Sequence, residues 1–146
     1  IRHEDETCTT TWRIDQHYPM EKNSQQYPGA EWLSEGVLTP IDFYALPYRC
    51  FYSKDVRNMF MAGRNISVTH IALGSTRVMR TCGMIGEVVG MAASVCMKRN
   101  ALPRDIYTTY FADLQELMRK GTGRTDVPYT QFYHQVDRTG HQAEDR

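Results

Sequence analysis

The sequence predicts an α/β fold, and three patterns along the chain carry that prediction. The first half holds short segments rich in β-branched and aromatic residues, residues 58–63 form an apolar run that ends in glycine, and residues 79–97 form a long apolar stretch. The chain has 146 residues, of which 41% are hydrophobic. That length is typical of one domain, and the hydrophobic share can form a core.

Strands are expected in the first half of the chain. Residues 9–15 combine threonines, a tryptophan and an isoleucine in a partly alternating order, which favours a strand. Residues 37–54 hold further apolar and aromatic clusters interrupted by Pro40 and Pro47, so we expect short strands or extended segments there. The rest of residues 1–36 is polar with turn signals, which indicates loop.

The apolar run at residues 58–63 is short, continuous and closed by Gly63. Such a run suits a fully buried strand of a parallel sheet. Residues 64–76 are polar or small and show no clear period, so no element is predicted for them.

Residues 79–97 give the strongest helical signal. Apolar or small residues occur nearly all round this stretch, and a helix that is apolar on every side is buried. Gly83, Gly86 and Gly90 lie on much the same side, although each interior glycine costs up to about 1 kcal/mol relative to alanine. The repeated cost indicates close approach of a backbone or ligand, or tight helix–sheet packing, and the two explanations are compatible.

Residues 103–120 predict a second, amphipathic helix. Pro103 suits its first turn, Asp105 favours its N-terminal end, and Gly121 follows two cations as a stop signal. The sequence beyond is polar with a charged end, and we expect loop there.

Composition removes several classes of function. Lys plus Arg is 17 and Asp plus Glu is 17, so the formal net charge is zero and a charge-driven nucleic-acid binder has no support. No apolar run approaches the roughly 18 uncharged residues of a membrane helix.

The cysteines form no C-x-x-C pair, and Cys82 and Cys96 are expected to be buried free thiols. Residues 3–6 include metal-ligating types, but no second cluster completes a metal site.

A strand that ends in glycine, followed by a loop and a glycine-rich helix, is an arrangement that can cradle a cofactor. Ligands of open α/β sheets bind beyond the carboxyl ends of strands, and a helix N-terminus offers free N–H groups to oxygen atoms that carry negative charge. Here that N-terminus falls at residues 80–83. Many such units bind nothing, so this pattern alone leaves plain packing open.

Three segments, residues 58–67, 72–82 and 86–93, carry a resemblance to a known family. Together with residues 11–19 and 46–49, they resemble the C-terminal end of a family of FAD-dependent oxidoreductases, two-domain flavoproteins of the glutathione-reductase-like superclass. The first segment reads Asn58-Met59-Phe60-Met61-Ala62-Gly63-Arg64-Asn65-Ile66-Ser67. The resemblance covers residues 9–121; the combination is specific, whereas each motif alone would be weak.

The resemblance implies the C-terminal portion of a Rossmann-like FAD-binding domain with extended segments from a substrate domain. Residues 1–45 would be the return segment of the substrate domain, residues 46–121 the C-terminal part of the FAD-binding domain, and residues 122–146 a polar tail. The chain has no initiator methionine and no G-x-G-x-x-G unit, which in this superclass holds the ADP half of FAD. We therefore expect a piece of a longer flavoprotein that is inactive without its N-terminal part.

The resemblance also implies a set of cofactor-binding residues. Residues 62–64 resemble the strand-end motif that approaches the ribityl and pyrophosphate groups. Relatives often have an acidic residue after the glycine, whereas this chain has Arg64, which could meet a phosphate. Arg77 matches an arginine near the flavin, where a cation would stabilise the anionic reduced form. The full cofactor set comprises Ala62, Gly63, Arg64, Arg77, Thr81, Cys82 and Gly83, the last three through their backbone.

His17 and Arg77 are the predicted catalytic residues. Histidine titrates near neutral pH and can transfer protons, although most histidines in such segments are structural. His17, beside Asp15, is preferred to His70 because the segment that it resembles runs near the substrate side. Tyr18 could act similarly, but packing is the simpler role.

The predicted function is hydride transfer from a substrate C–H bond to FAD. A sugar or other hydroxylated substrate follows from family context alone. The implied partners are the N-terminal remainder of the same flavoprotein and a small-molecule substrate, with no nucleic acid and no membrane span. The alternative is a non-catalytic helical interaction module that folds without flavin.

Overall fold

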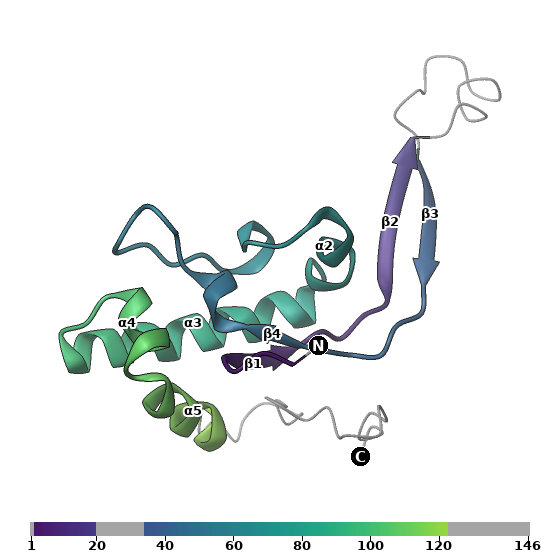
Figure 1. The fold of residues 1–146 in the computed structure, drawn as a ribbon. Coiled ribbons are helices and arrows are strands. Elements are labelled where there is room, and N and C mark those ends of the chain that lie inside the picture. Colours follow the sequence, from purple (N-terminus) through teal and green to yellow (C-terminus); the bar gives the residue numbers. More distant parts are fainter. Residues whose placement is uncertain (1, 20–33, 123–146) are drawn as a thin grey trace.

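Two antiparallel strand pairs and a set of helices make up the structure, a computed structural model that describes residues 2–19 and 34–122 (Figure 1). The elements are β1 (Glu6–Thr9), β2 (Ile14–Pro19), β3 (Ser34–Thr39), β4 (Ala45–Pro47), the 3-10 helices η1 (Tyr48–Phe51) and η2 (Gly63–Asn65), α2 (His70–Thr76), α3 (Met79–Arg99), α4 (Pro103–Thr108) and α5 (Phe111–Lys120). This mixture of helices and small sheets is consistent with the predicted α/β class. The predicted tail, residues 122–146, lies outside the described residues except for Thr122.

The strands form two separate pairs. β1 pairs with β4 beneath α3, whereas β2 and β3 form a hairpin that contacts α2 near its base and otherwise projects from the helices (Figure 1). The prediction of one strand over residues 9–15 is wrong, because β1 ends at Thr9 and β2 begins at Ile14. In between, Thr10 and Thr11 bond to Tyr44 and Thr81 instead of to a neighbouring strand of a continuous ladder. Likewise, the extended segment expected over residues 37–54 holds β4 but then turns into η1.

The apolar run at residues 58–63 is not a strand of a parallel sheet. Within it, Phe60 forms an isolated antiparallel bridge with Tyr52, and Met59 is 41% exposed. The run folds back on the chain before it, since Met61 N–H bonds to the carbonyl of Phe51. A short apolar run does not reveal which segment it will pair with, and the described strands provide no parallel partner for it.

α3 supplies one face of the hydrophobic core. Its buried apolar residues follow helical spacing and form one cluster with buried residues of β1, β4, η1, α4 and α5. The core consists of Cys8, Leu46, Tyr48, Phe51, Ile66, Met84, Ile85, Val88, Ala92, Val95, Ile106, Leu114 and Met118. Tyr48 also donates its hydroxyl hydrogen to the carbonyl of Pro103 over 2.7 Å, which ties η1 to the start of α4.

The opposite face of α3 is open within the described part of the chain, so these residues bury one side of the helix and burial all round stays a prediction. A methyl group added to Gly83, Gly86 or Gly90 would meet no described atom within 4 Å. Met79 and Met97, at the two ends of the helix, are 92% and 87% exposed. Cys82 and Cys96 are free, as predicted, but half-buried.

The helices after and before α3 differ from the prediction. The single helix expected over residues 103–120 is interrupted between Thr108 and Phe111, where a β-branched residue has a low helix propensity. Its start and stop are confirmed, because the Asp105 carboxylate accepts a hydrogen bond from Leu102 N–H and Gly121 ends α5 at φ 66°. The sequence does not predict α2, since its seven residues are too few to show a period.

Candidate functional site

His17 and Asp15 lie on the same face of β2. Side chains two positions apart in a strand point to one side, and here Nε2 of His17 is 3.0 Å from Oδ1 of Asp15. The hairpin register places Gly36 of β3 opposite His17. A methyl group at Gly36 would lie 3.3 Å from Cε1 of His17, so the glycine leaves room for the imidazole ring.

Arg77 joins the same group of side chains from the end of α2. It is the C-terminal cap of that helix, and its Nη2 donates a hydrogen bond to the backbone carbonyl of Asp15 over 2.9 Å. The same nitrogen is 3.5 Å from Oδ2 of the Asp15 carboxylate. The structure therefore brings the two predicted catalytic residues together, with Asp15 between them.

Gly74 allows this arrangement. A methyl group there would lie 2.9 Å from the Asp15 carbonyl oxygen, closer than real contacts allow, and a tight 3.1 Å from its nitrogen. Because Gly74 has no side chain, α2 can lie directly against β2. Asp15 and Gly74 belong to the geometry of the site, yet sequence reasoning did not select them; the alternation of Asp15 with His17 was the available signal.

The predicted cofactor residues gather at the N-terminus of α3. Ala62 caps η2 and the next two residues belong to it; η2 packs against α3, and Gly63 has a positive φ of 70° that favours glycine. Arg64 is exposed. Burial raises the pKa of the Cys82 thiol, and the nearby positive charge of Arg64 partly opposes that rise. Arg64 belongs to η2 and Cys82 to the first turn of α3, two elements that pack against each other.

Thr81 has a structural role that the sequence did not indicate. Its side chain is fully buried, and its Oγ1 accepts a hydrogen bond from the backbone N–H of Thr11 over 3.1 Å and lies 2.9 Å from the Thr11 hydroxyl. These contacts fix the first turn of α3 to the segment that leads into β2. The Thr81 side chain is therefore directed inward, and the role of its backbone toward a cofactor stays a prediction.

Polar groups with spare hydrogen-bonding capacity surround the start of α3. The helix has no side-chain cap at Val78, so N–H groups of its first turn remain available. Thr76 is fully buried, and its Oγ1 has no hydrogen-bond partner among the described residues. Its carbonyl accepts a contact from Cys82 Sγ over 3.5 Å. This end of α3 therefore offers N–H donors, the exposed Arg80 guanidinium of its own first turn and open space at Gly83.

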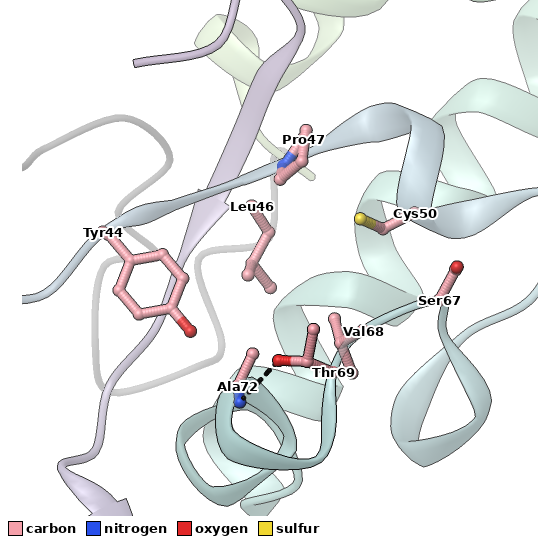
Figure 2. Close-up of a pocket in the computed structure, with 8 residues that line it drawn as sticks. All are labelled: Tyr44, Leu46, Pro47, Cys50, Ser67, Val68, Thr69 and Ala72. Carbon is pink, nitrogen blue, oxygen red and sulfur yellow. Dashed lines mark hydrogen bonds between the residues drawn. The ribbon is translucent and has the colours of Figure 1, made fainter. Parts of the chain in front are cut away.

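A pocket of about 470 Å³ lies on the other side of α2, between β4, η1 and the start of α2 (Figure 2). Figure 2 shows the side chains of Tyr44, Leu46 and Ala72 directed into this space. The pocket is lined by Tyr44, Leu46, Pro47, Cys50, Ser67, Val68, Thr69 and Ala72. None of the predicted site residues lines it. Thr69 Oγ1 caps α2 and the Tyr44 hydroxyl lies 2.8 Å from Ser75 Oγ, so these two hydroxyl groups already have structural partners.

Metal-binding groups and membrane-spanning helices were sought among the described residues. They contain no group of three or more His, Cys, Asp or Glu side chains that could hold a metal ion. No single described helix is long and apolar enough to cross a membrane; α2 and α3 pass the length and composition test only as a pair, bent by 93°.

Comparison with known proteins gives one match. The sequence model of the family described as FAD dependent oxidoreductase matches residues 1–118. No curated protein and no solved structure matches the chain at a significant level. The family model covers most of the chain, including every residue of the His17 group and of the α3 N-terminus. The chain therefore belongs to the family of FAD-dependent oxidoreductases, and its cofactor is FAD.

Proposed function

We propose that this chain is the C-terminal segment of a glutathione-reductase-like flavoprotein that transfers a hydride from a hydroxylated substrate to FAD. The observation that carries the proposal is the convergence of His17, Asp15 and Arg77, with Arg77 two residues before the start of α3. A proton-transfer group and a cation thus share one carboxylate, and the chain continues from that cation into a helix N-terminus suited to negatively charged oxygens.

The residues at the start of α3 fit FAD. The free N–H groups of the first turn and the exposed Arg64 guanidinium are hydrogen-bonding groups suited to phosphate and carbonyl oxygens. When FAD is bound, its isoalloxazine supplies the hydride acceptor. Arg77 would then place a positive charge near the N1–O2 edge, while residues 62–64 would approach the ribityl and pyrophosphate groups.

His17 would accept the proton that a substrate hydroxyl loses as its carbon gives up a hydride. Nε2 of the imidazole is already engaged by the Asp15 carboxylate, which leaves Nδ1 for the substrate. The ring is 46% exposed, so a small molecule can reach it. The substrate C–H bond would supply the hydride that bound FAD accepts, and the proton of the substrate hydroxyl would move to Nδ1 of His17.

The domain division belongs to the same proposal. Residues 1–45 would return from the substrate domain, residues 46–121 would complete a Rossmann-like FAD-binding domain, and the N-terminal remainder of the flavoprotein would be the partner. Two features support this: the β2–β3 hairpin projects from the helices beyond its contact with α2, and α3 has an open face of glycines. The second feature would equally serve a non-catalytic helical interaction module, which remains the alternative.

Flavin binding by the full-length polypeptide that carries this sequence tests the proposal. We expect it to purify with the absorbance bands of bound flavin, and Arg64→Gln to weaken FAD binding by about tenfold, the loss typical of one charged hydrogen bond. Arg119→Gln on exposed α5 is the matched control and should leave affinity unchanged. A colourless protein that does not bind added FAD would instead support the interaction module.

A further inference from the structure

We infer that Asp15 is a positioning residue that couples the proton-transfer group to the flavin-side cation, a role that rests on the proposed function of His17 and Arg77. The Asp15 carboxylate is the one group of the described site that contacts both side chains. Its Oδ1 faces His17 and its Oδ2 faces Arg77, at 3.0 Å and 3.5 Å.

The first effect of Asp15 concerns the His17 imidazole. An ionised carboxylate only accepts hydrogen bonds, so Oδ1 at 3.0 Å favours the ring form that carries its hydrogen on Nε2. In the neutral ring Nδ1 is then the unprotonated nitrogen, which is the form that can accept a proton. Asp15 thereby selects the tautomer in which His17 can act, as a buried carboxylate does for the histidine of a catalytic triad.

The second effect concerns the charge of Arg77. The backbone carbonyl of Asp15 holds the guanidinium in place at 2.9 Å, whereas the carboxylate adds a negative charge 3.5 Å away. The Asp15 carbonyl therefore holds Arg77 in position, while the Asp15 carboxylate partly offsets the charge of Arg77. Replacing the carboxylate by an amide should keep Arg77 in place and increase its net positive field.

Few other charged or titratable groups of β3 and α2 lie near Asp15 and His17. Opposite the two β2 side chains, β3 presents Gly36 and Leu38, which carry no charge. Of the residues of α2, which packs against β2, His70 is titratable, and Arg77 caps the helix. The side chains of Asp15 and Arg77 are 24% and 28% exposed, so their interaction is partly shielded from solvent.

The first experiment observes His17 directly by NMR in the full-length protein with ¹⁵N-labelled histidine. We expect an Nε2–H resonance protected from solvent exchange, identified by its loss in His17→Gln and abolished in Asp15→Ala. Asp42→Ala, which removes an exposed carboxylate from the loop before β4, should leave it intact. A resonance that is missing from the unmodified protein, or unchanged in Asp15→Ala, would overturn the inference.

The second experiment measures the reduction potential of bound FAD by titration with dithionite. Removing a negative charge beside the flavin favours the anionic reduced form, so Asp15→Asn should shift the potential to more positive values. Arg77→Gln should shift it to more negative values, and Asp42→Asn should have no effect. A potential that is unchanged or more negative in Asp15→Asn contradicts the inference. A protein without FAD would refute the proposed function, while the NMR experiment would still decide whether Asp15 orients His17.

Discussion

The guanidinium of Arg77 is bonded to the backbone carbonyl of Asp15 over 2.9 Å, across 62 positions of sequence. This bond ties the end of α2 to β2 and sets the distance between the helices and the protruding hairpin (Figure 1). Every proposed role of His17 and Arg77 depends on that contact, so the packing beneath it is the first feature to test.

Gly74→Ala should destabilise the protein by about 1–3 kcal/mol, the usual cost of overpacking. The new methyl group would lie 2.9 Å from the Asp15 carbonyl oxygen, a backbone atom that cannot move alone. Gly36→Ala is the matched control, because its methyl group would meet the movable His17 ring at 3.3 Å and should cost less. Chemical denaturation measures both. A gain of about 1 kcal/mol in Gly74→Ala, as expected for an unobstructed helix, would show that α2 does not lie against β2.

Arg49→Ala should cost about 3 kcal/mol of unfolding free energy, because it leaves the Asp5 carboxylate buried without its cation. Asp5 is fully buried, and it receives hydrogen bonds from the guanidinium of Arg49 and, over 2.9 Å, from the Arg49 backbone N–H. Asp5→Asn in the Arg49→Ala background should recover part of the loss, since the buried charge is then gone. Equal stability of the single and double variants would contradict this account.

The same pair predicts a pH dependence. Burial alone would raise the pKa of Asp5, but the hydrogen bonds and charge of Arg49 outweigh it and lower the pKa below its ordinary value. A lowered folded-state pKa stabilises the protein above the unfolded pKa of about 4, and this stabilisation is lost as the pH falls through the folded value. Unfolding free energies measured between about pH 6 and pH 3 should therefore fall less steeply in Asp5→Asn than in the unmodified protein.

Thr81→Val should destabilise the protein by about 1–2 kcal/mol, because it leaves the Thr11 N–H and hydroxyl without their partner. The absorbance spectrum of bound flavin should not change if only the backbone of Thr81 addresses the cofactor. Thr109→Val, at an exposed threonine, provides the control and should stay within about 0.5 kcal/mol. Unchanged stability of Thr81→Val would mean that the Thr11 contact contributes nothing.

Gly90→Ala tests whether another part of the flavoprotein covers the open face of α3. Among the described residues nothing lies within 4 Å of the new methyl group, so an uncovered helix should gain up to about 1 kcal/mol. In the full-length protein we expect a loss instead, because a packed sheet would meet the methyl group. Thermal unfolding of the full-length protein gives the sign, and a gain would favour the interaction-module alternative.

The candidate site was only partly predictable from the sequence. His17 and Arg77 were selected through a family resemblance, and the structure places them around one carboxylate. Asp15 is a sequence neighbour of His17, but its contact with Arg77 bridges 62 positions and leaves no local pattern. The role of Gly74 was equally unpredictable, because a glycine in a seven-residue helix gives no periodic signal of a close backbone contact.

The sequence by itself determined the family, the long helix α3 and the start and stop of the helices that follow it. These features depend on neighbouring residues, such as apolar spacing, Pro103 at a first turn and Gly121 at an end. The tertiary structure decided that residues 58–63 form a folded-back segment, that α3 buries one face, and that Asp15 connects His17 to Arg77. The physical reason is that burial and ion pairing depend on which distant segments meet, and local composition does not fix those meetings.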